Sequence, residues 1–249
     1  MKIIFRFLFT IYAMAGIIIA TAIVGSSVIV YSFFDKSGFC HIMANTWGKI
    51  LLKIVRIKVK VIGSDRFDPE KTYIFMGNHQ SHFDIPVIMS NLDIQYRWLA
   101  KAELFKIPIF GKAMEKVGYV KIDRFNKEAA FSSIDSLQNI LNNNISVVIF
   151  PEGTRSKSDT IMPFKKGGFV LAMNSRIPVV PVAIYGTMSI LPKNHFFINS
   201  GRVVIEFMKP IDTKQFNNKE ELMDVVRQQI TETYNRLKKD YTFCGWIKH

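Results

Sequence analysis

Cysteine is nearly absent from this sequence of 249 residues. The only two cysteines, Cys40 and Cys244, lie near opposite ends of the chain. They have neither the spacing of a metal site nor the number that a disulfide framework needs, which indicates a reducing compartment or indifference to redox conditions. Internal repeats, linkers and low-complexity tracts are also missing. The length and this uniformity predict one sizeable domain plus an appendage.

Acidic residues are few. The sequence has 20 Asp and Glu residues against 33 Lys and Arg residues, which gives a formal net charge of +13. A chain this cationic is attracted to nucleic acid, to anionic lipid surfaces or to anionic substrates. The basic residues are dispersed along the sequence, and no known base-reading module is present. Nucleic acid is therefore not an expected partner.

Charge is missing altogether from residues 7–34. As a helix this segment would be about 42 Å long, against a hydrocarbon core of about 30 Å, so it is long enough to enter a bilayer. A signal peptide is the alternative, since Lys2 and Arg6 precede the run, but the run is too long and lacks a clear cleavage site. The Gly25–Ser27 interruption leaves a bent or half-inserted helix open.

Residues 39–56 have apolar side chains at helical spacing, with basic side chains beside them. We interpret this segment as an interfacial helix that contacts the membrane, with packing on the catalytic core as the alternative. Lys and Arg between residues 36 and 60 outnumber those before residue 7, so the positive-inside rule places the following domain on the cytoplasmic side. We expect a membrane segment over residues 1–56 and a catalytic domain over residues 57–249.

From residue 57 onward, short β-branched runs alternate with amphipathic or turn-rich stretches, which is typical of an α/β domain with a mixed central sheet flanked by helices. The predicted strands cover residues 57–62, 73–77, 96–100, 119–122, 146–150, 179–185 and 202–207. The main predicted helices cover residues 127–142, 168–176 and 219–239.

His79 and Asp84 lie where a predicted apolar strand gives way to a helix. Five residues apart, they can meet only if the chain turns between them. A neutral imidazole can accept a proton from an alcohol while a carboxylate holds its other nitrogen, so His79 is the predicted general base and Asp84 its partner. A Gly-x-Ser-x-Gly elbow is missing, so the nucleophile is expected to be a hydroxyl of the substrate.

Two other interpretations of this segment remain open. Ser81 and Asp84 have the spacing of an ordinary helix-capping box, which is compatible with a catalytic role. A metal site formed by His79, His82 and Asp84 lacks a clear further ligand elsewhere in the sequence, so no metal is expected.

Two further segments carry an arginine shortly after a predicted strand. Residues 150–156 read Phe-Pro-Glu-Gly-Thr-Arg-Ser, and Arg155 can hold a phosphate while Gly153 allows a ligand to approach the backbone. Residues 118–124 end in Asp123 and Arg124. Taken alone, the first segment favours a surface turn with a solvated arginine, and Asp123 and Arg124 are compatible with a surface ion pair.

These segments together resemble a known family, the lysophosphatidate (1-acyl-sn-glycerol-3-phosphate) and glycerol-3-phosphate acyltransferases. The resemblance rests on four blocks in the family's order, namely residues 78–84, 118–124, 150–156 and the Val-Pro-Val of residues 180–182. It implies a glycerol-3-phosphate acyltransferase-like fold with N-terminal membrane-associated helices. It also implies that His79, supported by Asp84, deprotonates the acceptor hydroxyl for attack on an acyl thioester without an acyl-enzyme.

The resemblance also implies which residues shape the substrate sites. They are Lys101, Arg124, Glu152, Gly153, Thr154, Arg155 and Pro181. Pro181 is expected beside the acyl donor or the substrate channel. Lys101 is one choice among several lysines, because Lys165 and Lys166 serve equally well.

The implied reaction transfers a fatty acyl group from acyl-CoA or acyl carrier protein to the sn-2 hydroxyl of 1-acylglycerol-3-phosphate and forms phosphatidic acid. The thioester is a co-substrate, and no other cofactor is expected. The expected partners are the two substrates and the lipid bilayer. Acyl carrier protein is a further partner if it supplies the acyl group. The alternatives are another lysolipid, with a different headgroup or a lyso-aminolipid, and a non-catalytic membrane lipid-binding protein.

Overall fold

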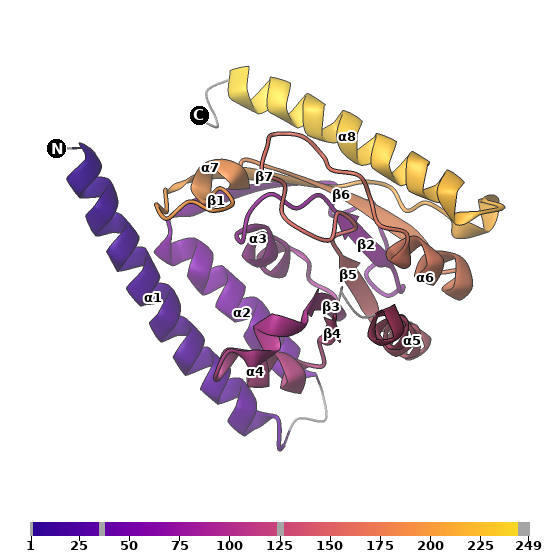
Figure 1. Cartoon of the computed structure of the whole chain (residues 1–249), viewed down its shortest axis with the longest axis horizontal. Helices are drawn as coiled ribbons and strands as arrows, with labels where there is room; N and C mark the ends of the chain where they lie inside the picture. Colours follow the sequence, from indigo (N-terminus) through magenta and orange to yellow (C-terminus); the bar gives the residue numbers. More distant parts are fainter. Residues whose placement is uncertain (1, 35–37, 124–126, 244–249) are drawn as a thin grey trace.

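The chain folds into three layers, with one seven-stranded sheet between two sets of helices (Figure 1). The computed structural model describes residues 2–34, 38–123 and 127–243. The strands are β1 (Ile57–Ile62), β2 (Ile74–Gly77), β3 (Tyr96–Lys101), β4 (Val120–Ile122), β5 (Ser146–Ile149), β6 (Val179–Tyr185) and β7 (Gly201–Phe207). Their order in the sheet is β1-β7-β6-β2-β5-β3-β4. Among these paired strands of the described residues, β6 and β7 alone are antiparallel, which confirms the predicted mixed sheet.

The helices divide between the two faces of this sheet. On one face lie α1 (Lys2–Tyr31), α2 (Phe39–Ile54), α3 (Asp84–Asn91) and α4 (Phe110–Val117). On the other lie α5 (Lys127–Asn142), α6 (Gly167–Ser175) and α8 (Lys219–Phe243). The short elements are α7 (Thr187–Ile190) and the 3-10 turns η1 (Ala102–Lys106) and η2 (Thr213–Gln215). In Figure 1, α8 crosses the sheet on the side opposite α2 and α4.

The central strands are apolar on both faces because helices cover both faces. In β2, Phe75 points to the core beneath α2 and α3, while Ile74 and Met76 point to the core beneath α8. All three side chains are 0% exposed. This alternation with a period of two residues is why the strand is a continuous apolar run in the sequence.

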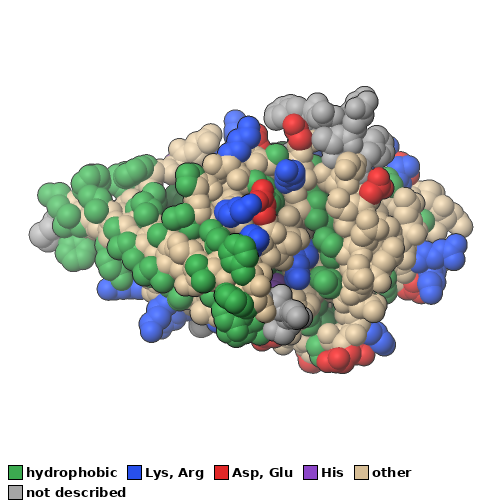
Figure 2. Space-filling model, turned by 90° about the horizontal axis from the view of Figure 1, so that it is seen from below, with side chains coloured by type: hydrophobic (Ala, Val, Ile, Leu, Met, Phe, Trp, Pro, Cys, Tyr) green, Lys and Arg blue, Asp and Glu red, His purple; other side chains and the backbone are tan. Residues whose placement is uncertain are grey.

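Helix α1 is continuous, so the Gly25–Ser27 interruption does not break it. Among the described residues it is the one helix long and apolar enough to cross a membrane. Figure 2 shows apolar side chains gathered over the end of the molecule where α1 lies. Its inner face packs on the domain, since Trp47 Nε1 of α2 donates to the Thr21 hydroxyl at 3.0 Å. Helix α1 is thus a candidate membrane-associated segment that is also part of the fold.

The apolar stripe predicted for the second helix does not form an outward membrane face. Leu51 is buried, and Met43, Trp47 and Ile54 are partly buried against the core. The face of α2 that meets α3 carries small residues such as Gly48, where a Cβ would lie 2.9 Å from the Cβ of Met89. Packing on the core, the alternative weighed above, is what the structure shows. The predicted boundary falls between α2 and β1, and the division into two units stays a prediction.

Truncation of a central core side chain tests the layered arrangement. Phe75 is fully buried and packs edge-on against Phe67 and Phe207, with ring centroids 5.3 and 6.2 Å away. We expect Phe75→Ala to lower the free energy of unfolding by about 3–5 kcal/mol through lost burial and a residual cavity. Denaturant unfolding in detergent, with the 63%-exposed Phe196→Ala as control, measures the difference. Equal stability of the two variants would contradict this packing.

Candidate active site

The site forms where parallel strands end side by side. Strand β2 pairs in parallel with β5, so the segments that follow both strands emerge at the same edge of the sheet. His79 follows β2, and Glu152 to Arg155 follow β5. The crevice beyond the carboxyl ends of parallel strands is where open α/β sheets bind ligands. Segments about 70 residues apart in the sequence thereby meet.

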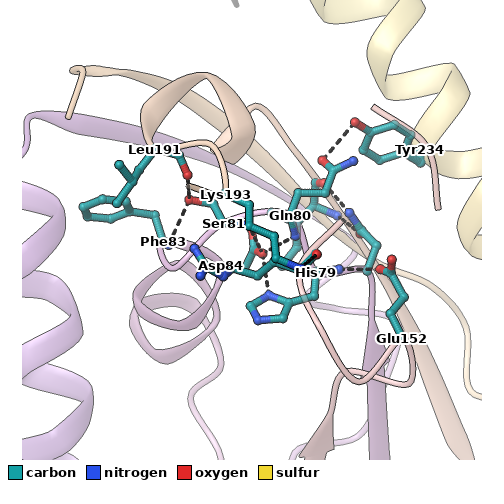
Figure 3. A network of polar contacts seen from close by, with 12 residues as sticks. His79, Gln80, Ser81, Phe83, Asp84, Glu152, Leu191, Lys193 and Tyr234 are labelled. Carbon is teal, nitrogen blue, oxygen red and sulfur yellow. Dashed lines mark hydrogen bonds and ion pairs between the residues drawn. The ribbon is translucent and has the colours of Figure 1, made fainter. Parts of the chain in front are cut away.

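His79 and Asp84 are hydrogen-bonded, as the predicted turn requires. His79 Nδ1 lies 2.8 Å from Asp84 Oδ2, and the backbone N–H groups of Gln80 and Ser81 donate to the same oxygen at 2.7 and 2.8 Å (Figure 3). Asp84 is the first residue of α3 and is 0% exposed. The Ser81 hydroxyl accepts from Phe83 N, but the N-cap of α3 is Phe83 and no side chain caps the helix, so Ser81 is not the N-cap of a capping box. A buried carboxylate with three donors is a fixed acceptor for the imidazole.

The imidazole ring of His79 stacks on an aromatic neighbour. Its ring centroid lies 4.0 Å from that of Phe150, with an angle of 6° between the two planes. The ring of Phe150 in turn contacts that of Trp98 in β3, with ring centroids 5.3 Å apart. With Nδ1 committed to Asp84, Nε2 is the nitrogen that can accept a proton from the cavity. The sequence reasoning missed this role of Phe150, although the residue stands at the start of a recognised block.

Glu152 is turned toward the backbone and away from the cavity. Its Oε1 accepts from His79 N at 2.7 Å and its Oε2 from Met162 N at 3.0 Å. The residue is 2% exposed, and burial raises the pKa of its carboxyl group to about 7. The geometry therefore gives Glu152 a positioning role under the His79 turn, and its part in the substrate site stays a prediction.

A cavity of about 440 Å³ extends from this site to the N-terminal helices. One end is apolar and is lined by α1, α2 and α4, with side chains such as Val24, Val28 and Trp47. The other end holds His79 and the cationic side chains that follow. Helix α1 is thus a wall of the cavity as well as a candidate membrane segment. Such a cavity fits a ligand with a long apolar part and an anionic end.

Cationic side chains cluster at the polar end. Arg155, Lys165 and Lys193 line the cavity, and in the described ranges no carboxylate pairs with any of them. Burial lowers the pKa of the Arg155 guanidinium. Lys101 also lines the cavity but forms an ion pair with Glu103 at 2.8 Å. The three unpaired cations form a site for an anion.

Lys193 was missed by the sequence reasoning, because it lies outside the four blocks. Its Nζ donates to the Thr154 hydroxyl at 3.0 Å and to the backbone oxygen of Arg155 at 2.8 Å. The ammonium group carries three protons, so one remains for a ligand. Gly153 has φ +69°, and a Cβ there would lie 2.9 Å from Lys165 Cδ. Glycine therefore allows both this turn and the close passage of Lys165.

The remaining residues named from the sequence differ in position. Pro181 lies inside β6, buried and paired in register with Met76, and is not among the residues that line this cavity, so its place beside the acyl donor or the substrate channel stays a prediction. Arg124 lies outside the described residues. His82 lines the cavity, where burial and then the charge of Arg155 lower its pKa to about 4, so its imidazole is neutral at pH 7.

A pH titration of stability tests the buried state of Glu152. An unfolded chain releases this proton near pH 4.5, whereas the folded chain holds it to about pH 7. The contribution of Glu152 to the free energy of unfolding should therefore fall as pH rises through this window, by about 3 kcal/mol at about 1.4 kcal/mol per pKa unit. His82, whose pKa is lowered, contributes the opposite slope in both proteins, so the difference in stability between the wild type and Glu152→Gln, measured by thermal unfolding between pH 4.5 and 8, should change by this amount. Parallel pH curves would contradict it.

The chain was compared with known proteins. A family model described as Acyltransferase matches residues 58–185, more than half of the chain. The chain is 32% identical over 200 residues to a chloroplastic 1-acyl-sn-glycerol-3-phosphate acyltransferase of Brassica napus, covering 79% of this chain and 56% of that protein. It is 30% identical over 201 residues to the 1-acyl-sn-glycerol-3-phosphate acyltransferase of Saccharomyces cerevisiae, covering 79% and 66%. The chain thus spans less than two thirds of either relative.

A solved structure extends the similarity to nearly the whole chain. The crystal structure of a 1-acyl-sn-glycerophosphate acyltransferase from Thermotoga maritima matches with a TM-score of 0.81 and 28% sequence identity. The match covers 96% of this chain and 98% of that one. The predicted fold class is therefore confirmed. The sequence match over residues 58–185 and this shared fold show that the chain belongs to the acyltransferase family.

Proposed function

We propose that this chain transfers a fatty acyl group from an acyl thioester to the free hydroxyl of 1-acylglycerol-3-phosphate and forms phosphatidic acid. One observation carries the proposal. The His79 imidazole, held by Asp84, stands between an apolar cavity and a cluster of unpaired cations. The acceptor has matching parts, with an acyl chain at one end, a phosphate at the other and the reacting hydroxyl between them. The names of the similar proteins favour the same substrate.

The reaction follows from the free nitrogen of His79. Nε2 removes the proton of the acceptor hydroxyl as its oxygen attacks the thioester carbonyl carbon. The tetrahedral intermediate then collapses, the carbon–sulfur bond breaks, and the thiolate leaves and takes the proton from the imidazolium. Asp84 stabilises the imidazolium between these steps. The enzyme returns to its starting state without a covalent intermediate.

The outer face of α1 suits contact with lipid. Its exposed apolar side chains include Ile4, Leu8 and Ile19, which are 65%, 57% and 59% exposed. We propose that α1 rests in the membrane so that a lysolipid reaches the cavity along its inner face without crossing water. The basic residues that follow α1 favour a cytoplasmic position for the catalytic domain.

Removal of the proposed base tests the reaction. We expect His79→Ala to reduce thiol release at least 100-fold when the detergent-purified protein is given 1-acylglycerol-3-phosphate and acyl-CoA or acyl carrier protein thioester. The exposed histidine variant His195→Ala should keep the wild-type rate. A wild type that is inactive with both donors would favour a non-catalytic lipid-binding protein. Faster turnover of another lysolipid would reassign the acceptor.

Two matched lysine variants test the phosphate site. Lys193→Met should raise the KM for 1-acylglycerol-3-phosphate about tenfold with little change in kcat, because an unpaired ammonium at the cavity mouth is lost. Lys101→Met should have a smaller effect, since Glu103 already pairs with that lysine. Kinetics with a monoacylglycerol, which lacks the phosphate, should show no difference between the variants. Equal KM values for the phosphate-bearing acceptor would contradict the assignment.

A further inference from the structure

Tyr234 joins the C-terminal helix to both halves of the site. The residue belongs to α8 and is 1% exposed. Its hydroxyl contacts the side-chain amide of Gln80 at 2.9 Å and the carboxylate of Asp159. Gln80 lies directly after His79, and Asp159 lies in the segment that follows β5 and carries Arg155. Figure 3 shows the phenol reaching from α8 toward the His79 turn.

The number of protons available decides which groups in this network donate hydrogen bonds and which accept them. A phenol has one proton, and here it meets an amide and a carboxylate. Burial, and then the hydrogen bond with Asp159, raise the pKa of Tyr234, so the phenol keeps its proton and donates it to the carboxylate. The structure places Gln80 Oε1 at 2.9 Å from the phenol oxygen, whereas Gln80 Nε2 is buried and has no partner in the described part of the chain. Because the phenol has only one proton to donate, we assign the amide the opposite orientation, in which Nε2 donates to Tyr234 and Tyr234 donates to Asp159.

Helix α8 does not need this hydroxyl to stay docked. Its apolar face is buried at Leu222, Val226, Ile230 and Leu237, each 0% exposed. Lys238 of α8 also pairs with Asp159 on the surface side. The hydroxyl therefore has more influence on the two loops that it touches than on the docking of its own helix.

We propose that Tyr234 is a positioning residue whose hydroxyl holds the His79 turn and the Arg155 segment in fixed register. This inference rests on the proposed function of that site. The Gln80 backbone N–H donates to Asp84 Oδ2, so a shift of Gln80 changes the support that Asp84 gives His79. A shift of Asp159 moves the segment that carries Arg155. Misplacement of reacting groups by about 1 Å costs on the order of 100-fold in rate.

A neighbouring tyrosine supplies a matched control. Tyr185 of β6 packs edge-on against Tyr234 with ring centroids 5.5 Å apart, and its hydroxyl contacts the Thr242 hydroxyl of α8 at 2.6 Å. Tyr234→Phe and Tyr185→Phe therefore each remove one phenol oxygen between α8 and the sheet. Tyr234→Phe removes the hydrogen bonds to Gln80 and Asp159 in the two loops of the site, whereas Tyr185→Phe removes the hydrogen bond to Thr242 of α8.

The kinetic test compares these two variants. Tyr234→Phe should lower kcat about tenfold with an unchanged KM for the acyl donor, while Tyr185→Phe stays within about twofold of the wild type. In a Gln80→Met background, Tyr234→Phe should add little further loss, because the two residues act through one contact. Equal rates for both tyrosine variants, or additive losses with Gln80→Met, would overturn the proposal.

Hydrogen–deuterium exchange on the same proteins tests the positioning role of Tyr234 without a measurement of enzyme activity. Tyr234→Phe should speed exchange in residues 78–84 and 153–160, and Tyr185→Phe should leave both segments at the wild-type rate. Unchanged exchange in these segments, or a change confined to α8, would overturn the positioning role. If the wild type is inactive with acyl thioesters but Tyr234→Phe still exchanges faster than the wild type in these two segments, the proposed reaction is refuted. The role of Tyr234 in holding the two loops is then retained.

Discussion

The carboxylate oxygen Oδ2 of Asp84 is the point on which the site depends. It accepts from the His79 imidazole and from two backbone N–H groups, in a residue with no solvent exposure. Three donors to Oδ2 offset part of the lost hydration of the buried carboxyl group and fix the direction of the imidazole, while Oδ1 has no partner among the described residues. Glu152 holds the same turn from the other side through His79 N. The His79 turn is thus held by Asp84, which contacts both ring and backbone, and by Glu152, which contacts the backbone alone.

The sheet explains why these groups meet. Because β2 and β5 are parallel neighbours, their carboxyl ends bring the His79 turn and the Arg155 segment together. Helices α1, α2 and α4 then close an apolar cavity on one face of the sheet, and α8 contacts both loops from the other. One architecture therefore places an apolar cavity, an imidazole and a cluster of cations side by side, as the proposed acyl transfer to a lysolipid requires.

Much of this could be predicted from the sequence, for local reasons. All seven strands were predicted to within two residues, because β-branched runs buried on both faces are conspicuous. The meeting of His79 with Asp84 was predicted as well, since it needs only one turn. Helix α4 was missed because it is short and rich in lysine. Lys193 and Tyr234 were missed because their partners are 38 to 154 residues away, and no local pattern encodes such contacts.

The central claim is that Asp84 holds His79 with its proton on Nδ1, so that Nε2 faces the cavity as the base. Nitrogen NMR of the histidine-labelled protein at neutral pH measures the tautomer directly. The account predicts that neutral His79 is protonated on Nδ1 in the wild type and that this preference is lost in Asp84→Ala. A wild-type imidazole protonated on Nε2 would contradict it.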